Sequence, residues 1–459
     1  MKVESIKIEV PADARYLVQT LEEEGYESYV VGGCVRDALM GRVPHDWDIC
    51  TSARPEEVER IFLSRKKKVV ETGLKHGTVT VVMHGEGYEI TTFRCDGDYT
   101  DGRHPDSVEF VKSLEEDLKR RDFTINAMAY SDLRGLMDPH DGSGDLQRKR
   151  IRCVGKPEER FSEDVLRIMR AIRFASVFGY TIEEKTSAAI RANIPRIFEA
   201  SMERITVEFR KMIVGEGFPS LADQFSDLIT FLIPEFRPCI GFKQKTHWHQ
   251  YDVWTHILKS VENVPCEAEI ERLAMFFHDI EKPSCVIYKE DGSTSFKGHA
   301  HVGAVTTDQI LRRMKFDNAT RELVTELVDY HDSLWNPTKK GMKRFLGKIG
   351  PEQMERLFVV RRADILAQNE LHIPEQMEEL ERAVTLYKQI LAENACVSLK
   401  DLAVKGADLI ELGIEKGPRM GQILNELLEE VISENLPNEK EVLLEAVRKR
   451  DYCSQVLQA

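Results

Sequence analysis

The stretch YVVGGCVRDALMGRVPHDWDIC, residues 29–50, joins a short apolar run, a glycine pair and two nearby aspartates. The apolar run predicts a β-strand that ends at Gly32 and Gly33, and we expect a helix to follow. Glycines at such a turn let backbone N–H groups approach a phosphate, and the helix N-terminus adds partial positive charge. A plain turn would explain the glycine pair alone, so the residues that follow it decide the interpretation.

Asp46 and Asp48 follow the turn and stand two residues apart in a β-like run, HDWDIC, so both carboxylates are expected on one face of a strand. Carboxylates this close repel each other unless a cation lies between them, and hard oxygen ligands suit Mg²⁺. Glu89, in the run YEITTF, is a candidate third carboxylate from a neighbouring strand. The pattern predicts catalytic, metal-binding aspartates for two-metal phosphoryl transfer, in which one ion activates the attacking hydroxyl and the other steadies pyrophosphate.

A second group of polar residues lies in SEDVLRIMRAIRFA, residues 162–175, which is expected to form a helix with Ser162 at its N-cap. Arg167, Arg170 and Arg173 recur every three residues and so project in neighbouring directions. A solvated helix face would explain this row alone. A sharper interpretation is that Asp164 and Arg167 read a base edge, because a carboxylate accepts from an exocyclic amine while a guanidinium donates to a ring acceptor. Such a pair would accept cytosine and adenine and refuse guanine and uracil.

These segments together resemble the class II tRNA nucleotidyltransferases, the CCA-adding enzymes of the polymerase-β-like superfamily. The similarity covers the glycine turn with VRD (35–37), the DxD, RRDFTINA (120–127) and EDxxRxxRAxRF (163–174). It implies addition of CCA to the tRNA 3′ end from CTP and ATP, with Mg²⁺ as cofactor. It also implies nucleotide-binding roles for Gly32, Gly33, Arg36, Arg121, Asp122, Asn126, Asp164, Arg167, Arg170 and Arg173.

Three alternatives stay open. Bacterial poly(A) polymerases share most of these motifs but usually carry a basic RRFRLxHV-like run, where this chain has ETGLKHGTVTVV (71–82). Partial enzymes add only CC or only A, and CC-adding relatives tend to lack part of a loop before RRDF. This chain retains FRCDGDYTDGRHPDSVEF (93–110), which favours full CCA addition on the strength of Asp98, Tyr99, Asp101, Arg103 and Pro105. A hydrolase whose head only binds RNA would require a broken DxD, and here the DxD is intact.

Histidines and aspartates gather in a third region, between residues 247 and 364, and clustering of this kind suggests metal ligands. The segments FFHDIEKP (276–283) and FKGHAHVGA (296–304) resemble the HD superfamily of metal-dependent phosphohydrolases. His256, His278, Asp279 and Asp364 match its H…HD…D pattern. The resemblance implies a second divalent metal there and hydrolysis of phosphomonoesters or cyclic phosphodiesters. The alternative is a structural relic without metal.

Composition sets the remaining limits. The formal charge of −14 excludes a protein that coats nucleic acid by charge alone, although a local basic groove remains compatible with it. No apolar run is long enough to span a bilayer, and the first residues lack the apolar core of a secretory signal. Nine scattered cysteines without a CxxC pair predict reduced thiols in a cytoplasmic protein. We therefore expect no membrane association, and no obligate protein partner is evident.

The expected fold class is α+β, in four parts. A polymerase-β-like nucleotidyltransferase head with a mixed sheet covers residues 1–150, and an all-α neck with the nucleotide-templating helix covers 151–235. An HD-type helical domain follows at 236–370, and a helical tRNA-binding tail at 371–459.

Overall fold

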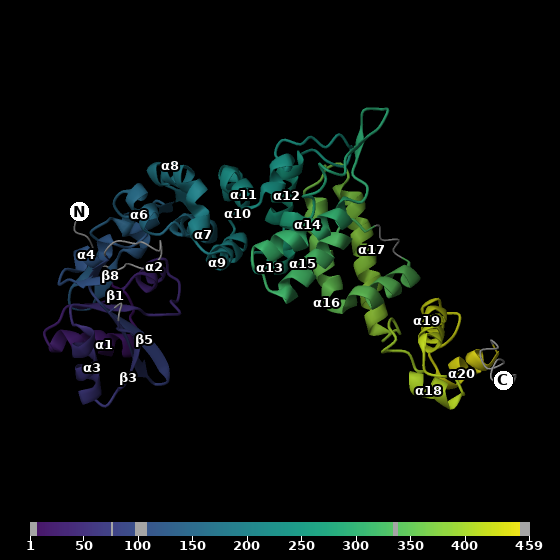
Figure 1. Cartoon of the computed structure of the whole chain (residues 1–459), viewed down its shortest axis with the longest axis horizontal. Helices are drawn as coiled ribbons and strands as arrows, with labels where there is room; N and C mark the ends of the chain where they lie inside the picture. Colours follow the sequence, from purple (N-terminus) through teal and green to yellow (C-terminus); the bar gives the residue numbers. More distant parts are fainter. Residues whose placement is uncertain (1–6, 75–76, 97–107, 334–337, 450–459) are drawn as a thin grey trace. The chain divides into compact units, whose positions relative to one another are not determined.

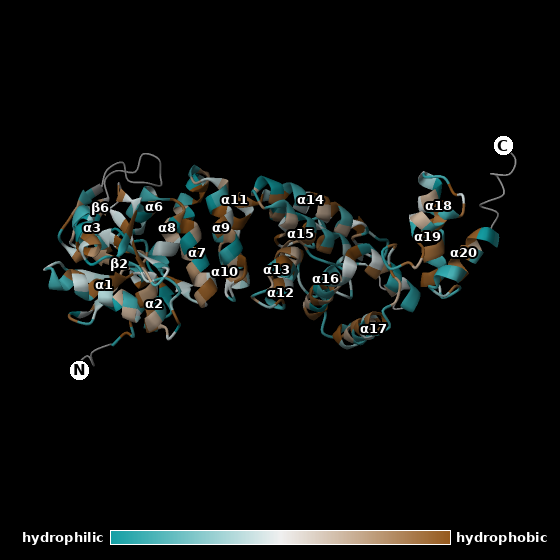
Figure 2. Cartoon of the chain, turned by 90° about the horizontal axis from the view of Figure 1, so that it is seen from below, coloured by the Kyte–Doolittle hydropathy of each residue, from teal (hydrophilic) through white to brown (hydrophobic). Residues whose placement is uncertain are grey.

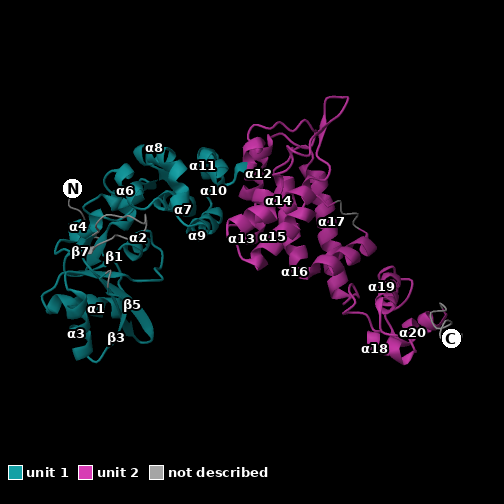
Figure 3. Cartoon of the chain, viewed as in Figure 1, with its two compact units in different colours: residues 1–234 teal, residues 235–459 magenta. Residues whose placement is uncertain are grey.

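The computed structural model describes residues 7–74, 77–96, 108–333 and 338–449 of the 459-residue chain. The chain divides into two compact units, residues 1–234 and 235–459 (Figure 3). Strands of the main sheet lie in the purple-to-blue part of the colour range in Figure 1, and the second unit, coloured from teal through green to yellow, is mostly helical. Across the described residues, no helix combines the length and apolarity needed to cross a membrane.

The first unit is built around a sheet of strand order β3-β4-β5-β2-β1-β8-β9. Its strands are β1 (Ser28–Val31), β2 (Ile49–Thr51), β3 (Lys68–Gly73), β4 (Thr78–Met83), β5 (Glu86–Thr92), β8 (Ala129–Ser131) and β9 (Gly135–Met137). β2 and β5 run parallel, whereas the other neighbouring pairs in this order are antiparallel. The predicted mixed sheet is confirmed, and the runs SYVV and TVTVVM form β1 and β4.

Helices and a small strand pair complete the head. They are α1 (Ala12–Glu23), α2 (Gly33–Leu39), α3 (Pro55–Ser64), β6 (Arg94–Asp96), β7 (Val108–Phe110), α4 (Leu114–Lys119), the 3-10 turn η2 (Thr124–Asn126) and α5 (Gly142–Gln147). α3 shows how the local sequence determines where such a helix begins. Pro55 occupies its first turn, where its missing N–H costs nothing, and the Glu57 side chain accepts from the backbone N–H of Arg54 at 2.8 Å.

The neck follows without a break in the first unit. Its elements are β10 (Arg150–Ile151), α6 (Pro157–Glu163), α7 (Arg167–Phe178), β11 (Thr181–Ile182), α8 (Glu184–Asn193), η3 (Ile194–Glu199), α9 (Met202–Ile213), α10 (Phe218–Gln224) and α11 (Ser226–Leu232). It is helical except for the short parallel pair β10–β11. The expected N-cap at Ser162 is wrong, because Ser162 lies inside α6 and the chain breaks at Asp164, which is extended. The Asp164 carboxylate accepts the N–H of Leu166 at 3.0 Å and so satisfies a donor at the start of α7.

The second unit consists of helices and one short hairpin. The turn η4 (Pro234–Cys239) leads into α12 (Val253–Glu262), α13 (Glu269–Phe277), the hairpin β12 (Ile287–Tyr288) and β13 (Thr294–Ser295), α14 (His299–Arg313), α15 (Asn318–Tyr330), α16 (Lys339–Leu366), α17 (Ile373–Ala392), α18 (Gly406–Glu411), α19 (Pro418–Ile432) and α20 (Lys440–Lys449). The helices carry both hydrophobic and hydrophilic residues (Figure 2), as expected of amphipathic helices. α18, α19 and α20 share a hydrophobic cluster of their own around Leu409, Ile423 and Leu443.

Candidate functional site

Three acidic residues lie near the start of β2. Asp46 and Asp48 are exposed and directly precede β2, so the expectation that they lie within the strand is wrong by a few residues. Exposed and buried side chains nevertheless alternate as in a strand, because Trp47, between the two aspartates, and Ile49, after Asp48, are both buried. The parallel register that places Ile49 opposite Ile90 brings Asp48 alongside Glu89 of β5. The sheet therefore supplies the neighbouring-strand carboxylate that the sequence suggested.

The charges around Asp48 point to a cation. Desolvation by the surrounding protein has the largest effect on the pKa of Asp48 and raises it, although the residue is exposed. The positive charge of Arg121 lowers this pKa, and the negative charges of Glu89 and Asp46 raise it. Mutual repulsion of this kind is relieved by a bound divalent ion, and the donor set is oxygen only, which fits Mg²⁺. Among the described residues, the sets of three ligand atoms within 4.8 Å of one another lie in the second unit rather than here. The carboxylates of Asp46, Asp48 and Glu89 are therefore not among these sets.

Gly32 directly follows Val31, whose backbone N–H donates to the carbonyl oxygen of Asp48 at 2.9 Å. The φ of Gly32, 81°, is a left-handed conformation that favours glycine, and a Cβ there would come within 2.8 Å of Arg121 Nη1. The Nε of Arg121 is buried and has no hydrogen-bond partner among the described residues. A guanidinium held against a glycine turn, next to Asp48, is a suitable donor for the phosphates of a nucleotide.

A chain of hydrogen bonds connects four of the predicted nucleotide-binding residues. Arg36 Nη1 donates to Asn126 Oδ1 at 2.6 Å, and Asn126 Nδ2 donates to Asp122 Oδ1 at 3.1 Å. The other oxygen of Asp122 accepts from Arg170 Nε at 3.0 Å and from Arg170 Nη2 at 2.6 Å. The chain therefore joins α2 and η2 of the head to α7 of the neck.

Three arginines surround one aromatic ring on α7. The guanidinium carbons of Arg173, Arg36 and Arg170 lie 3.9, 5.3 and 5.4 Å from the centre of the Phe174 ring. Arg173 also pairs with Glu208 of α9, Nε to Oε2, at 2.8 Å. The predicted row of arginines is thus not a solvated helix face, because Phe174 and the buried Glu208 hold it against the protein.

The proposed base-reading pair lies at the break between α6 and α7. Asp164 Oδ2 accepts from Arg204 Nη2 of α9 at 2.9 Å. Arg167 donates instead to the Glu163 carboxylate and to the carbonyl oxygen of Arg120. Asp164 and Arg167 thus stand three residues apart in the sequence, and each side chain is held by a different partner.

The loop residues that favoured full CCA addition, Asp98, Tyr99, Asp101, Arg103 and Pro105, lie outside the described residues.

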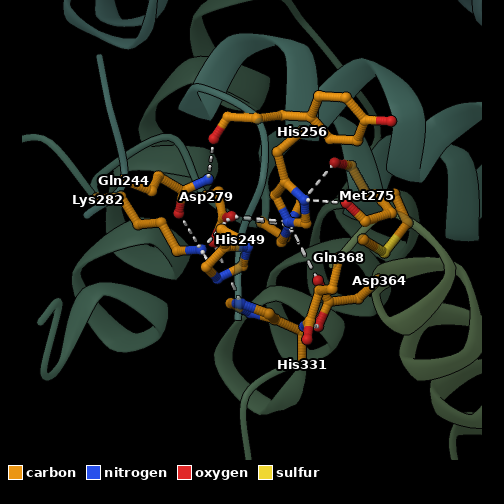
Figure 4. Close-up of polar contacts among 12 residues, drawn as sticks. Gln244, His249, His256, Met275, Asp279, Lys282, His331, Asp364 and Gln368 are labelled. Carbon is orange, nitrogen blue, oxygen red and sulfur yellow. Dashed lines mark hydrogen bonds and ion pairs between the residues drawn. The ribbon is translucent and has the colours of Figure 1, made fainter. Parts of the chain in front are cut away.

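The four predicted HD ligands converge in the second unit, from the ends and interiors of separate helices, and Figure 4 labels His256, Asp279 and Asp364 among them. His256 lies on α12, His278 and Asp279 directly follow α13, and Asp364 lies in the last turn of α16. His256 Nε2 is 3.2 Å from Asp279 Oδ2 and 3.1 Å from Asp364 Oδ1. His278 Nε2 is 3.1 Å from Asp279 Oδ2. All four side chains are buried, so the cluster is part of the core.

Two further histidines, which the H…HD…D pattern did not include as ligands, lie in the cluster. His299, the first residue of α14, and His331, directly after α15, face the other oxygen of Asp279. Their Nε2 atoms lie 3.2 and 3.6 Å from Asp279 Oδ1. The structure thus contains two groups able to hold a metal ion, His256–His278–Asp279 and Asp279–His299–His331.

Lys282 and a cavity lie next to the cluster. Figure 4 shows Lys282 directed at Asp279 and Gln244, with Nζ 2.6 Å from Asp279 Oδ2 and 3.0 Å from Gln244 Oε1. Burial opposes charge on His256, yet Asp279 and Asp364 raise its pKa to about 9. Burial, followed by Lys282, lowers the pKa of His249 to about 2. A cavity of about 670 Å³ opens beside these groups.

The chain is similar to known proteins along nearly its whole length. The model of the Poly A polymerase head domain family matches residues 28–152, and that of tRNA nucleotidyltransferase domain 2 matches 298–447. The CCA-adding enzyme of Pediococcus pentosaceus is 37% identical over 95% of this chain and 97% of its own length. The chain belongs to the CCA-adding enzymes. The CCA-adding enzyme of Levilactobacillus brevis is 36% identical over 95% of the chain and 96% of its own length.

A solved structure supports the same assignment. The crystal structure of the Bacillus stearothermophilus CCA-adding enzyme in complex with CTP has a TM-score of 0.69 and 32% identity, and the match covers 95% of this chain and 98% of that one. The chain is therefore a nucleotidyltransferase with the fold of the CCA-adding enzymes.

Sequence reasoning missed several residues around these sites. Arg204 and Glu208 of α9, which hold Asp164 and Arg173, stand four residues apart and so share a helix face, which was the available signal. Lys282 follows the HD dipeptide by three residues, and its role became visible only through its contact with Asp279.

Proposed function

We propose that this CCA-adding enzyme adds C, C and A in turn to the 3′ end of tRNA, from CTP and ATP and without a nucleic-acid template, in the cytoplasm. The main support for this proposal is that Asp48 and Glu89 lie beside the Gly32 turn and Arg121. The arginine-lined side of α7 lies next to them. The relatives in Pediococcus and Levilactobacillus bear the name of this activity, and the Bacillus structure contains CTP.

The proposed reaction is an attack of the tRNA 3′-hydroxyl oxygen on the α-phosphorus of the nucleotide. A new P–O bond forms, the anhydride bond to the β-phosphate breaks, pyrophosphate leaves, and the hydroxyl proton passes to solvent. Two Mg²⁺ ions, when bound, would activate the hydroxyl and neutralise the leaving pyrophosphate. Asp46, Asp48 and Glu89 would hold the ions, while Arg121 and Arg36 would bind and orient the triphosphate.

Base choice is assigned to Asp164 and Arg167. The Asp164 carboxylate accepts from Arg204 and the Leu166 N–H, so its position is set before a nucleotide arrives. A base that takes the guanidinium of Arg167 would replace Glu163 as its partner. Arg170 and Arg173 would line the pocket from the next turns of α7.

One assay tests this function against its alternatives: the purified chain, Mg²⁺, tRNA lacking its 3′ CCA, and each labelled nucleotide singly and together. CCA addition predicts two C residues with CTP and one terminal A after ATP is added. Long A tails on unrelated RNAs would indicate a poly(A) polymerase. Products that stop at CC, or A addition restricted to tRNA ending in CC, would indicate a partial enzyme.

We propose a second function for the HD cluster, a metal-dependent phosphohydrolase. The four predicted ligands are buried, and the Nε2 atoms of His256 and His278 lie 3.1–3.9 Å from carboxylate oxygens of Asp279 and Asp364. A cavity adjoins this cluster. A bound divalent ion would polarise a phosphoryl oxygen there. In the hydrolysis, the water oxygen bonds to phosphorus, the ester P–O bond breaks, and a water proton passes to the leaving oxygen.

Hydrolysis of 2′,3′-cyclic AMP and of p-nitrophenyl phosphate, with Ni²⁺, Mn²⁺ or Mg²⁺, tests this second function. Wild-type chain should be active with at least one of these ions, and His278→Ala should lose that activity. The matched control is His301→Ala, because His301 is 78% exposed and lies outside the cluster. An inactive wild type would support the relic interpretation.

A further inference from the structure

We propose that the 3′-terminal strand of the RNA acceptor lies across the solvent-facing side of β3, β4 and β5 while its last hydroxyl reacts. This inference deepens the nucleotide transfer proposed above and rests on it. It assigns a binding surface to the end of the RNA that is extended, and it is tested by RNA binding and crosslinking as well as by activity.

The strands β3, β4 and β5 have one covered face and one open face. Val79, Val81 and Met83 of β4 are buried, as are Tyr88 and Ile90 of β5. The amphipathic helix α3, which has a buried apolar side, contacts all three strands. The residues that alternate with the buried ones are exposed or half-buried. This open face consists of Lys68, Val70, Thr72, Thr78, Thr80, Val82, Gly87, Glu89 and Thr91.

The register of the strands links the open face to the carboxylates. Thr80 of β4 stands directly opposite Glu89 of β5 and, on its other side, opposite Val70 of β3. Glu89 in turn lies alongside Asp48, because β2 and β5 run parallel with Ile49 opposite Ile90. The open face therefore begins at Glu89 and extends across two further strands to the edge of the sheet.

The sheet order indicates the side from which the RNA arrives. In the order β3-β4-β5-β2-β1, Asp48 lies between Glu89 on β5 and the Gly32 turn after β1. Arg121, the proposed phosphate donor, is next to Gly32 and so lies on the β1 side. In an in-line displacement the attacking and leaving oxygens are on opposite sides of phosphorus. With pyrophosphate on the β1 side, the hydroxyl approaches from the β5 side, where the open face lies.

Threonine hydroxyls on the open face are suitable donors for an RNA backbone. The Oγ1 atoms of Thr72 and Thr80 are 2.8 Å apart, and those of Thr78 and Thr91 are 3.0 Å apart. In each pair one hydroxyl donates to the other, and the second hydroxyl keeps its hydrogen for an outside acceptor such as a phosphate or ribose oxygen. Such contacts position a strand without reading its sequence.

Three further residues fit the same occupant. Lys68 is exposed at the outer end of the face and attracts phosphates. Val70, 39% exposed, offers apolar contact to a ribose or a base. Gly87 carries no side chain, and a Cβ there would come within 3.0 Å of Thr80 Cγ2, so the surface between β4 and β5 stays low. The face thus combines hydroxyl, cationic and apolar contacts in the proportions of a single RNA strand.

The first test reverses the charge at Thr72, which is exposed on β3, two strands away from Glu89. Thr72→Glu should raise the KM and the Kd for tRNA lacking its 3′ CCA roughly fivefold, the Coulomb effect of one charge close to a phosphate in water, and Thr72→Lys should lower both. Both effects should shrink as the salt concentration rises. The affinity for CTP should not change, because the nucleotide binds on the other side of Asp48.

Ser64 provides the matched control, since it is an exposed hydroxyl residue at the end of α3, the helix that contacts these strands from the covered face. Ser64→Glu and Ser64→Lys should leave the KM and the Kd for tRNA unchanged. Effects of the same sign from both charges at Thr72, or equal effects at Ser64, would overturn the proposal.

The second test needs no variant. 4-Thiouridine is placed at each of the last three positions of tRNA lacking its CCA, and the complex with the wild-type chain is irradiated and mapped by mass spectrometry. Adducts on β3 and β4 are expected, and adducts confined to other segments would refute the surface. Crosslinks to β3 and β4 in a chain that adds no nucleotide would uphold the surface and refute the proposed transfer.

Discussion

Asp122 is the residue at which the head and the neck meet. It is buried, and it binds Asn126 of η2 through one oxygen and Arg170 of α7 through the other. Burial works against its charge, but Arg170 and Asn126 hold its pKa at about 2. Removing either partner of such a pair would leave an uncompensated buried charge, which is strongly destabilising.

Asp122→Asn should destabilise the chain at neutral pH by about 2–3 kcal/mol, the value of a pKa difference between about 2 and about 3.9. Because the folded pKa is lowered, this stabilisation is present above about pH 4 and is lost as the pH falls toward 2. Chemical unfolding followed by circular dichroism from pH 2 to 7 should show the wild-type advantage shrinking over that window. Glu56→Gln, at an exposed position on α3, is the control. An advantage that does not change with pH would contradict the assignment.

Asp48→Ala should lower nucleotide addition by about 10²-fold or more, because it removes a carboxylate that we propose holds Mg²⁺ and supports the transition state electrostatically. Asp46→Ala should lower nucleotide addition to a similar extent, since Asp46 and Asp48 both lie in the segment just before β2. Single-turnover addition of labelled CTP with saturating Mg²⁺ measures the effect, with Glu56→Ala as the matched surface control. Near-normal transfer by either aspartate variant would reject the catalytic role.

At the scale of elements, the break between α6 and α7 matters most. A continuous helix from Ser162 would have carried Asp164 on its surface, whereas the break leaves Asp164 extended and its carboxylate bound to Leu166 and Arg204. α9 supports this arrangement, because it packs against α7 and supplies both Arg204 and Glu208 (Figure 1).

Asp164→Ala or Arg167→Ala should relax the preference for CTP and ATP over UTP and GTP. Each lost contact of this kind is worth about 1–3 kcal/mol, or roughly 10- to 100-fold in discrimination. Arg204→Ala should change the same ratio, because it releases the carboxylate that Arg204 holds. The measurement is the ratio of kcat/KM among the four nucleotides, with the exposed Lys211→Ala on α9 as control. Unchanged exclusion of UTP and GTP would place base selection elsewhere.

At the scale of the whole molecule, the chain has two units, and each contains one candidate site. The head carboxylates are oxygen donors that suit Mg²⁺, whereas the HD cluster is rich in imidazole nitrogen, which suits transition metals. The two sites therefore differ in both ligand chemistry and location, and we expect them to act independently.

His278→Ala should abolish hydrolysis of 2′,3′-cyclic AMP while nucleotide addition to tRNA stays within about twofold of wild type, the scatter of a surface substitution. Asp48→Ala should produce the reverse pattern. Both activities are measured on the same full-length preparations, with circular dichroism to show that each variant is folded. Loss of nucleotide addition in well-folded His278→Ala would disprove independence.

The sequence alone indicated the family and the mixed sheet, because these depend on short-range patterns, and it supplied the candidate site residues. Gly32 beside VRD, the alternation through Asp46 and Asp48, and the H…HD…D spacing are all readable along the chain. Local rules also identified β1 and β4, whose apolar runs admit few other conformations.

Tertiary structure alone decided which of these residues meet. The register of β2 against β5 brings Glu89 to Asp48, the break at Asp164 depends on Arg204 from α9, and Asp279 gathers histidines from four helix ends or interiors. Apart from the adjacent His278 and Asp279, these contacts join residues 20 to 52 positions apart, and their distances follow from packing rather than from sequence spacing. His299 and His331 became candidate ligands for this reason, since only the fold shows that both face the same carboxylate oxygen.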